Sequence, residues 1–176
     1  MISMLDEISV AYMGMIASIL MAAAMFLNWQ VQKQQPGMAL WTFAYISGAI
    51  GIILIGLRSS LSHVVSIALA NIFLDGFVCF IWIGIRRFAG KASGGWWTSV
   101  VLIIAHLCLN LHNVMVAPEV ETRIISASVF NMIFFGLCLF EMASCSNYSR
   151  KYSVSSVIMA ILVMHIVFNG YRIVMV

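Results

Sequence analysis

The chain has 176 residues, of which 63% are hydrophobic and only 9% are Asp, Glu, Lys or Arg, and its net charge is +3. A typical soluble domain is about 25% charged, and a chain with a mean hydropathy of +1.05 has more apolar surface than a fold of this size can hide from water. This composition excludes a soluble enzyme, a disordered chain and, because no basic patch is present, a nucleic-acid-binding protein.

Six apolar stretches are each about as long as one helical bilayer crossing, which takes about 20 residues. In chain order they cover residues 8–27, 38–57, 64–85, 96–116, 124–142 and 154–171. Asp6 and Glu7 precede the first stretch, whereas a cleaved signal peptide would carry positive charge there, so this helix is expected to be retained. The sequence predicts an all-α polytopic transmembrane bundle of about six helices, with residues 1–176 as one domain.

Small residues recur at helix-packing spacing in the first two stretches. Ala44 with Gly48, and Ser47 with Gly51, form small-xxx-small rows that let helix backbones approach closely in lipid. The four cysteines show no CxxC spacing, and we assign them neither a disulfide nor a metal.

The basic residues predict the orientation of the bundle. If successive loops alternate sides, six of the nine basic residues lie on one side: Lys33, Arg86, Arg87, Lys91, Arg150 and Lys151. Basic loops stay in the cytoplasm. The prediction is a protein of the bacterial inner membrane with a periplasmic N-terminus, and six crossings would place the C-terminus outside as well.

Polar side chains inside the apolar stretches are costly in lipid and usually face the bundle interior. They recur at i, i+4 and i+7, which places each set on one helical face. The candidate ligand-binding residues are Asn71, Asp75, His106, Asn110, Asn113, Asn131, His165 and Asn169. Rise along the helices places most of them at one level in the outer leaflet.

Two interpretations of this polar layer stay open. The groups could hydrogen-bond across helices and fix their packing, at about 0.6 kcal/mol per contact. They could instead form a pocket, open to the periplasm, for a small ligand, a proton or an ion. His106 and His165 could also be the two axial ligands of a haem, although no cofactor is the main expectation.

Residues 36–91 resemble the N-terminal membrane region of bacterial GGDEF-type diguanylate cyclases. In that family a tryptophan-led helix with paired glycines ends in an arginine and a short polar loop. A second helix with an Ala-Asn pair follows and ends in an Arg-Arg-Phe-x-Gly turn. The matching positions are Trp41, Gly48, Gly51, Arg58, Ser66, Ile67, Asn71, Gly76, Gly84, Arg86, Arg87, Phe88 and Gly90.

The resemblance implies a sensory membrane domain that controls a cytoplasmic cyclase making cyclic di-GMP, and a homodimer formed through the full-length protein. It also implies a seventh helix, after which the output domain would begin, so the sequence is expected to stop short of both. The chain itself carries no GGDEF motif and no HExxH or GxSxG motif, so we do not expect an enzyme. The alternative function is a small transporter or channel that uses Asp75, His106 and His165 as a relay.

Overall fold

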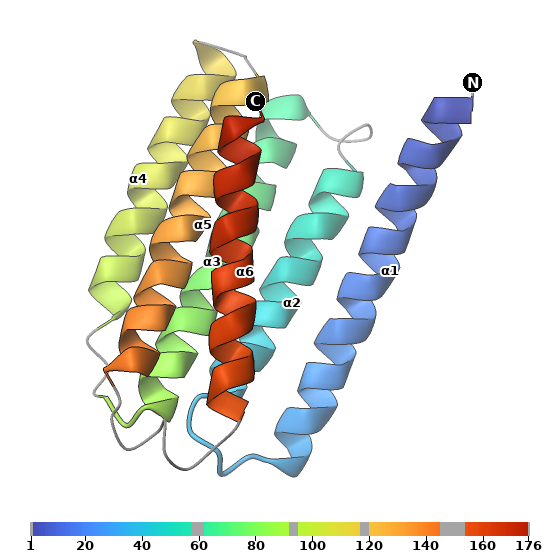
Figure 1. Cartoon of the computed structure of the whole chain (residues 1–176). Helices are drawn as coiled ribbons and strands as arrows, with labels where there is room; N and C mark the ends of the chain where they lie inside the picture. The colour runs from blue at the N-terminus through green and yellow to red at the C-terminus, as the bar shows by residue number, and fades with distance from the viewer. Residues whose placement is uncertain (1, 58–61, 92–94, 117–119, 145–153, 176) are drawn as a thin grey trace.

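The computed structural model describes residues 2–57, 62–91, 95–116, 120–144 and 154–175, and the side chains of the first, third and sixth helices from Ser9, Val65 and Met159 onwards. This part of the chain forms six helices and no strand (Figure 1): α1 (Ile2–Val31), α2 (Met38–Gly56), α3 (His63–Phe88), α4 (Trp96–Met115), α5 (Val120–Ala143) and α6 (Val154–Val174). Five of these helices, α1 to α5, are long and apolar enough to cross a membrane. The predicted all-α membrane bundle is confirmed, and the chain is a multi-pass membrane protein.

Four of the six helices, α1, α3, α5 and α6, extend further than the apolar stretches that predicted them, whereas α2 and α4 each end one residue earlier. α1 continues to Val31, past residue 27, because its polar last turn contains no helix breaker before Pro36. α3 begins at His63, one residue before the predicted stretch, and runs on to Phe88, three residues beyond it. In α6 the described apolar stretch, Met159–Val174, is shorter than the other five spans. Hydropathy marks where a chain enters lipid, whereas a helix continues into the interface until its hydrogen bonding is interrupted.

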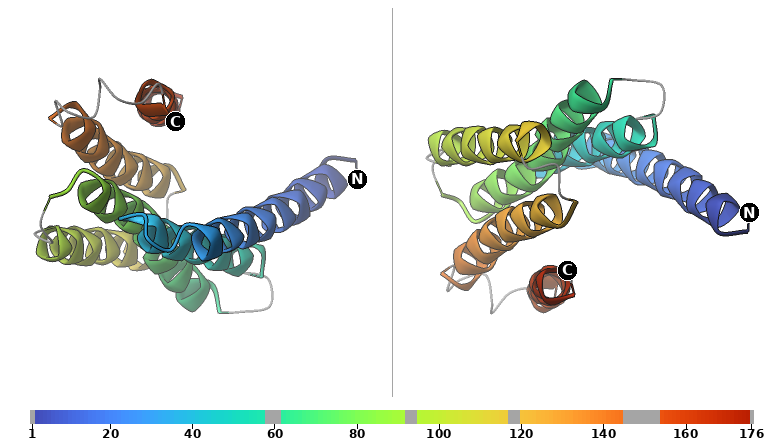
Figure 2. Two further views of the ribbon diagram at one scale, coloured as in Figure 1. Left: turned by 90° about the horizontal axis from the view of Figure 1, so that it is seen from below. Right: turned by 90° about the horizontal axis from the view of Figure 1, so that it is seen from above.

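α3 is the central helix, and the bundle is open rather than closed. α3 packs against α2, α4 and α5, whereas α1 packs only against α2, and α6 only against α5. Figure 2 shows α1 and α6 at the two ends of the resulting row. One side of the row, between α6 and α2, is therefore not covered by another helix among the described residues.

The apolar core lies between α3 and α5. Val78, Trp82 and Ile83 of α3 meet Phe134 and Cys138 of α5, and each of these side chains is buried. The Trp82 and Phe134 rings meet edge to face, with their centroids 5.7 Å apart. Such aromatic contacts add to the dispersion energy that holds helices together in lipid, where no hydrophobic effect drives their association.

The small-residue rows of α2 pack against α3, as predicted. Ala44, Ser47, Gly48 and Gly51 are all buried. A Cβ atom added at Gly51 would lie 2.8 Å from Cγ of Leu74, closer than side chains approach. Ser47 uses the same proximity to donate a hydrogen bond of 2.6 Å to the Phe73 carbonyl oxygen. Close packing of α2 on α3 therefore requires small residues at these positions.

Most of the positions that carry the family resemblance lie in this α2–α3 interface. The Trp41 indole lies against Gly84, where there is no room for a Cβ atom, and its Nε1 donates to the Ile81 carbonyl oxygen at 3.3 Å. At the other end, Ser66 Oγ donates to the Leu54 carbonyl oxygen at 3.0 Å. The matched residues build the fold, and Arg58 lies outside the described residues.

Candidate functional site

One face of α4 carries a row of buried polar side chains. His106, Asn110 and Asn113 are all buried, as their spacing predicted, and Ser99 extends the row by two turns. Asn110 Nδ2 donates to the His106 carbonyl oxygen at 3.0 Å, which stiffens this part of the helix. α4 therefore turns its polar face to α3 and α5 and its apolar face to lipid.

Asp75 and His106 form a buried pair between α3 and α4. His106 Nδ1 and Asp75 Oδ2 are 2.8 Å apart, and the two side chains are only 4% and 5% exposed. The imidazole also stacks on Phe130 of α5, with ring centroids 4.3 Å apart and planes 13° from parallel. The sequence predicted both residues as polar groups of the interior but could not pair them. Three helices meet at this one imidazole.

The second ring nitrogen of His106 is unsatisfied. With Asp75 ionised, its carboxylate only accepts hydrogen bonds, so Nδ1–H is the donor in the pair and Nε2 of the neutral ring is an acceptor. Nε2 is buried and has no hydrogen-bond partner among the described residues. A buried polar atom without a partner costs about 1–3 kcal/mol. The pair thus presents one free position, at Nε2, to a proton or to a hydrogen-bonding ligand.

Further polar groups lie on α5 and α6. Ser126 and Ser128 of α5 and Asn169 of α6 are buried. Among the described residues, Ser128 Oγ and Asn169 Oδ1 have no hydrogen-bond partner. Two further predicted site residues, Asn71 and Asn131, are half-buried. Of the predicted site residues, Asp75, His106, Asn110, Asn113 and Asn169 are buried, and Asp75 and His106 contact each other directly.

His165 does not join this cluster. It is exposed on α6, where Nδ1 donates to the Ile161 carbonyl oxygen at 2.9 Å and the ring contacts Phe135 of α5 at 4.9 Å. His106 instead contacts Phe130 of α5. Phe130 and Phe135 are five residues apart, so they point in directions about 140° apart around the α5 axis, and the two imidazoles contact different sides of that helix. This arrangement gives them no shared space for a haem, and the haem prediction gains no support.

Towards the opposite end of the bundle the interior is mainly apolar. From Asp75 to Arg86, α3 rises about 16 Å. The buried side chains over this distance include Val78, Trp82 and Ile83 of α3 and Phe134 and Cys138 of α5. Apolar packing therefore separates most of the polar interior from the far end, although the Ser99 hydroxyl of α4 is buried within this region.

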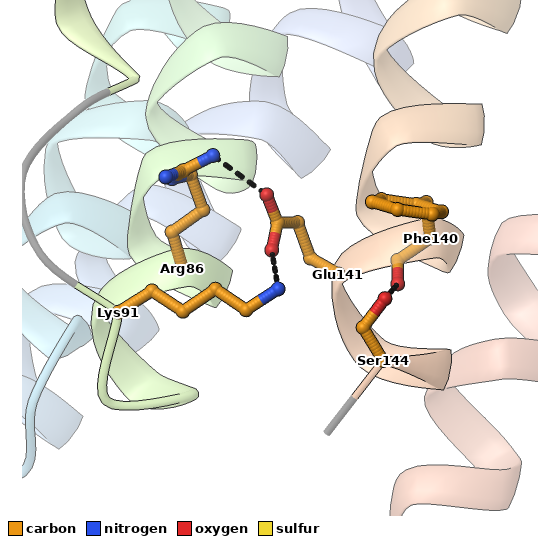
Figure 3. Close-up of polar contacts among 5 residues, drawn as sticks. All are labelled: Arg86, Lys91, Phe140, Glu141 and Ser144. Atoms are coloured by element: carbon orange, nitrogen blue, oxygen red, sulfur yellow. Dashed lines mark hydrogen bonds and ion pairs between the residues drawn. The ribbon is translucent and has the colours of Figure 1, made fainter. Parts of the chain in front are cut away.

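At that far end, three charged side chains form an ion cluster (Figure 3). Arg86 Nη1 lies 2.6 Å from Glu141 Oε1, and Lys91 Nζ lies 2.5 Å from Glu141 Oε2. Glu141 is 5% exposed, and its partners are 22% and 34% exposed. The Arg86 guanidinium also lies over the Trp82 ring, 5.4 Å from its centroid. The cluster joins the ends of α3 and α5.

The end of α3 places Lys91 in this cluster. Gly90 has a φ of +73°, a left-handed conformation that glycine adopts readily. The Gly90 and Lys91 amides donate to the Arg87 and Arg86 carbonyl oxygens, both at 3.0 Å. This is a Schellman cap, and it turns the chain back over the helix end. The sequence did not predict this cluster, although Arg86 and Glu141 carry opposite charges at the same predicted membrane boundary.

Several residues from the sequence analysis lie outside the described part of the chain. These are Arg150, Lys151 and one of the four cysteines, Cys145, together with the side chains of Asp6 and Glu7. The other three cysteines are free, with Cys79 and Cys138 buried and Cys108 exposed. No group of three or more His, Cys, Asp or Glu side chains that could hold a metal occurs among the described residues.

Comparison of the chain with models of known protein families, with curated proteins and with solved structures finds no match.

Proposed function

We propose that this chain is a membrane-embedded sensory domain of a bacterial signalling protein, and that the Asp75–His106 pair is its receiving site. The observation that carries the proposal is the buried, unpartnered Nε2 of His106 at the meeting point of three helices. A protein that used these residues only for packing would gain by satisfying that atom. The stimulus is a proton or a small ligand that reaches Nε2 from the periplasmic side.

The mechanism is a shift between two helix packings. A ligand changes an equilibrium only by the difference in its affinity for the two states. Phe130 of α5 stacks on the face of this imidazole, so a ligand or proton that binds Nε2 acts on a ring that contacts α5, and its binding favours a packing in which the contact between α4 and α5 has changed. α5 also ends in Glu141, which is bound to Arg86 and Lys91 at the other end of the bundle. A displacement of α5 therefore acts on the junction of α3 and α5 in the cytoplasmic interface.

The output follows from the resemblance of residues 36–91. The sensory domain controls a cytoplasmic diguanylate cyclase, the bundle lies in the inner membrane with its N-terminus in the periplasm, and the full-length protein acts as a homodimer. The excess of basic residues on one side of the bundle supports this orientation. In this orientation the polar half of the interior faces the periplasm, and the Arg86–Lys91–Glu141 cluster faces the cytoplasm.

A transporter or channel is the alternative, because a buried His–Asp pair can also relay protons. A relay needs polar groups across the full thickness of the membrane. Between the two polar regions Trp82, Ile83 and Phe134 pack together, and the buried Ser99 hydroxyl beside them does not make a continuous polar path. His165, the third member of the predicted relay, lies on a different side of α5.

The test measures cyclic di-GMP in cells that express the gene with its natural continuation in a host lacking its own cyclases. Asp75→Asn and His106→Gln each remove or weaken the hydrogen bond between the two side chains. A hydrogen bond to a charged group is worth about 1.5–3 kcal/mol, and its loss can shift a two-state equilibrium more than tenfold. We expect both variants to change cyclic di-GMP several-fold at equal membrane levels. His112→Gln, at an exposed position of the same helix, is the matched control and should match wild type.

Two outcomes would overturn the proposal. One is wild-type cyclic di-GMP in both pair variants, with both proteins folded in the membrane. The other is a proton flux in proteoliposomes that wild type supports and Asp75→Asn abolishes, which would establish the transporter instead.

A further inference from the structure

A lateral cavity of about 280 Å³ lies on the uncovered side of the bundle, between α2 and α6, with α3 and α5 behind it. Most of its lining is apolar, and five of the lining residues are aromatic. The lining side chains used below are those of Trp41, Tyr45, Phe77, Phe135, Ile161 and His165. Because α6 packs only against α5 and α1 only against α2, the cavity opens sideways towards lipid.

The size of the cavity selects a small molecule over another helix. A transmembrane helix of 20 residues is about 30 Å long and 10 Å wide, a volume of about 2,400 Å³. Pockets for small molecules hold about 300–1,000 Å³. At about 280 Å³, the space fits a ring-sized group and not a helix. The lateral opening leaves room for an attached tail to extend into the bilayer.

His165 gives the cavity one specific chemical feature. Its Nδ1 lies 2.9 Å from the Ile161 carbonyl oxygen, and a carbonyl only accepts, so Nδ1 carries the hydrogen. In the neutral ring the other nitrogen, Nε2, is then an acceptor. The indole N–H of Trp41, also in the lining, already donates to the Ile81 carbonyl oxygen. The imidazole therefore favours a ligand that donates a hydrogen bond.

From this geometry we infer that the cavity binds a membrane quinol, a planar hydroxylated ring on an apolar tail. The aromatic lining offers faces and edges against which such a ring packs. A quinol hydroxyl donates to His165 Nε2, whereas the carbonyl of the oxidised quinone cannot. His165 thus favours the reduced form, whereas the Tyr45 hydroxyl, which also lines the cavity, can hydrogen-bond either form. This inference goes beyond the proposed function and stands apart from the Asp75–His106 pair.

The experiment measures binding of a short-chain ubiquinol and its quinone to the full chain in lipid nanodiscs, under anaerobic conditions, by quenching of tryptophan fluorescence. We expect wild type to bind the quinol about three- to tenfold more tightly than the quinone, the range for one hydrogen bond. His165→Phe should bind both forms equally, at the quinone level of wild type. His165→Gln, whose amide oxygen can accept, should recover part of the preference.

A second pair of variants tests the place of binding. Ile161 lines the cavity and Val163 does not, although both lie on α6 and are 47% and 48% exposed. Ile161→Trp fills the space and should abolish binding of both forms, whereas Val163→Trp should bind as wild type does. The inference fails if wild type binds neither form, if binding survives Ile161→Trp, or if His165→Phe keeps the quinol preference. None of these outcomes depends on cyclic di-GMP output, so the two proposals fail separately.

Discussion

Glu141→Gln is the substitution that most directly tests the ion cluster. It keeps the size of the side chain and removes the charge that two cations share. Each hydrogen bond to a charged partner is worth about 1.5–3 kcal/mol, and removing one member of a fully buried pair costs about 3–5 kcal/mol. The cations are 22% and 34% exposed, so both can turn their charge to the headgroups and recover part of the loss. We expect the free energy of unfolding to fall by about 2–3 kcal/mol.

The measurement is reversible unfolding in mixed detergent micelles, followed by helical circular dichroism. Glu121→Gln is the matched control, because Glu121 lies at the opposite end of α5 and is exposed. Its effect should stay within about 0.5 kcal/mol. A double-mutant cycle with Arg86→Gln should give a coupling energy of about 1–2 kcal/mol. If Glu141→Gln costs no more than the Glu121 control, the cluster does not hold α3 to α5, and the cytoplasmic end of the proposed mechanism is refuted.

Three further predictions concern packing and orientation. Gly51→Ala should destabilise the fold by about 1–3 kcal/mol in the same unfolding assay, because its Cβ would meet Leu74 at 2.8 Å. Gly136→Ala is the control and should have no such cost, because a Cβ there meets nothing within 4 Å. Equal effects of the two substitutions would contradict the α2–α3 packing. Ser47→Ala removes the bond to the Phe73 carbonyl oxygen and should cost about 0.6 kcal/mol, up to about 1.7, and a stabilising effect would count against that bond. Alkaline phosphatase fused after Val116 should be active, and green fluorescent protein fused after Ser144 should fluoresce. The reverse pattern would contradict the proposed orientation.

Much of the fold follows from local properties of the sequence. Each apolar stretch became a helix because a backbone in lipid must satisfy its own hydrogen bonds, and a helix does so within one segment. Close packing by α2 was also predictable, since Ser47 and Gly51 are small residues four positions apart, about one turn of helix, although this spacing does not name α3 as the partner. The inward face of α4 followed from the spacing of His106 and Asn110 for the same reason.

The pairing of side chains from different helices was decided by the tertiary structure. Asp75 and His106 are 31 residues apart, and Arg86 and Glu141 are 55 apart, so no local spacing could show that they meet. The Schellman cap at Gly90 was needed to bring Lys91 to Glu141 as well. Composition and spacing name the polar groups of a helix, but the rotation of that helix against its neighbours decides which of them meet.

His165 shows the same division most clearly. Its spacing from Asn169 correctly placed the two on neighbouring turns of one helix, and the Asn169 amide donates to the His165 carbonyl oxygen at 2.8 Å. Yet Asn169 is buried, whereas His165 faces the lateral cavity. Periodicity assumes that the polar side of a helix has a neighbour to face. α6 has only α5 beside it, and only the assembled bundle could reveal that its histidine lies in an opening towards lipid.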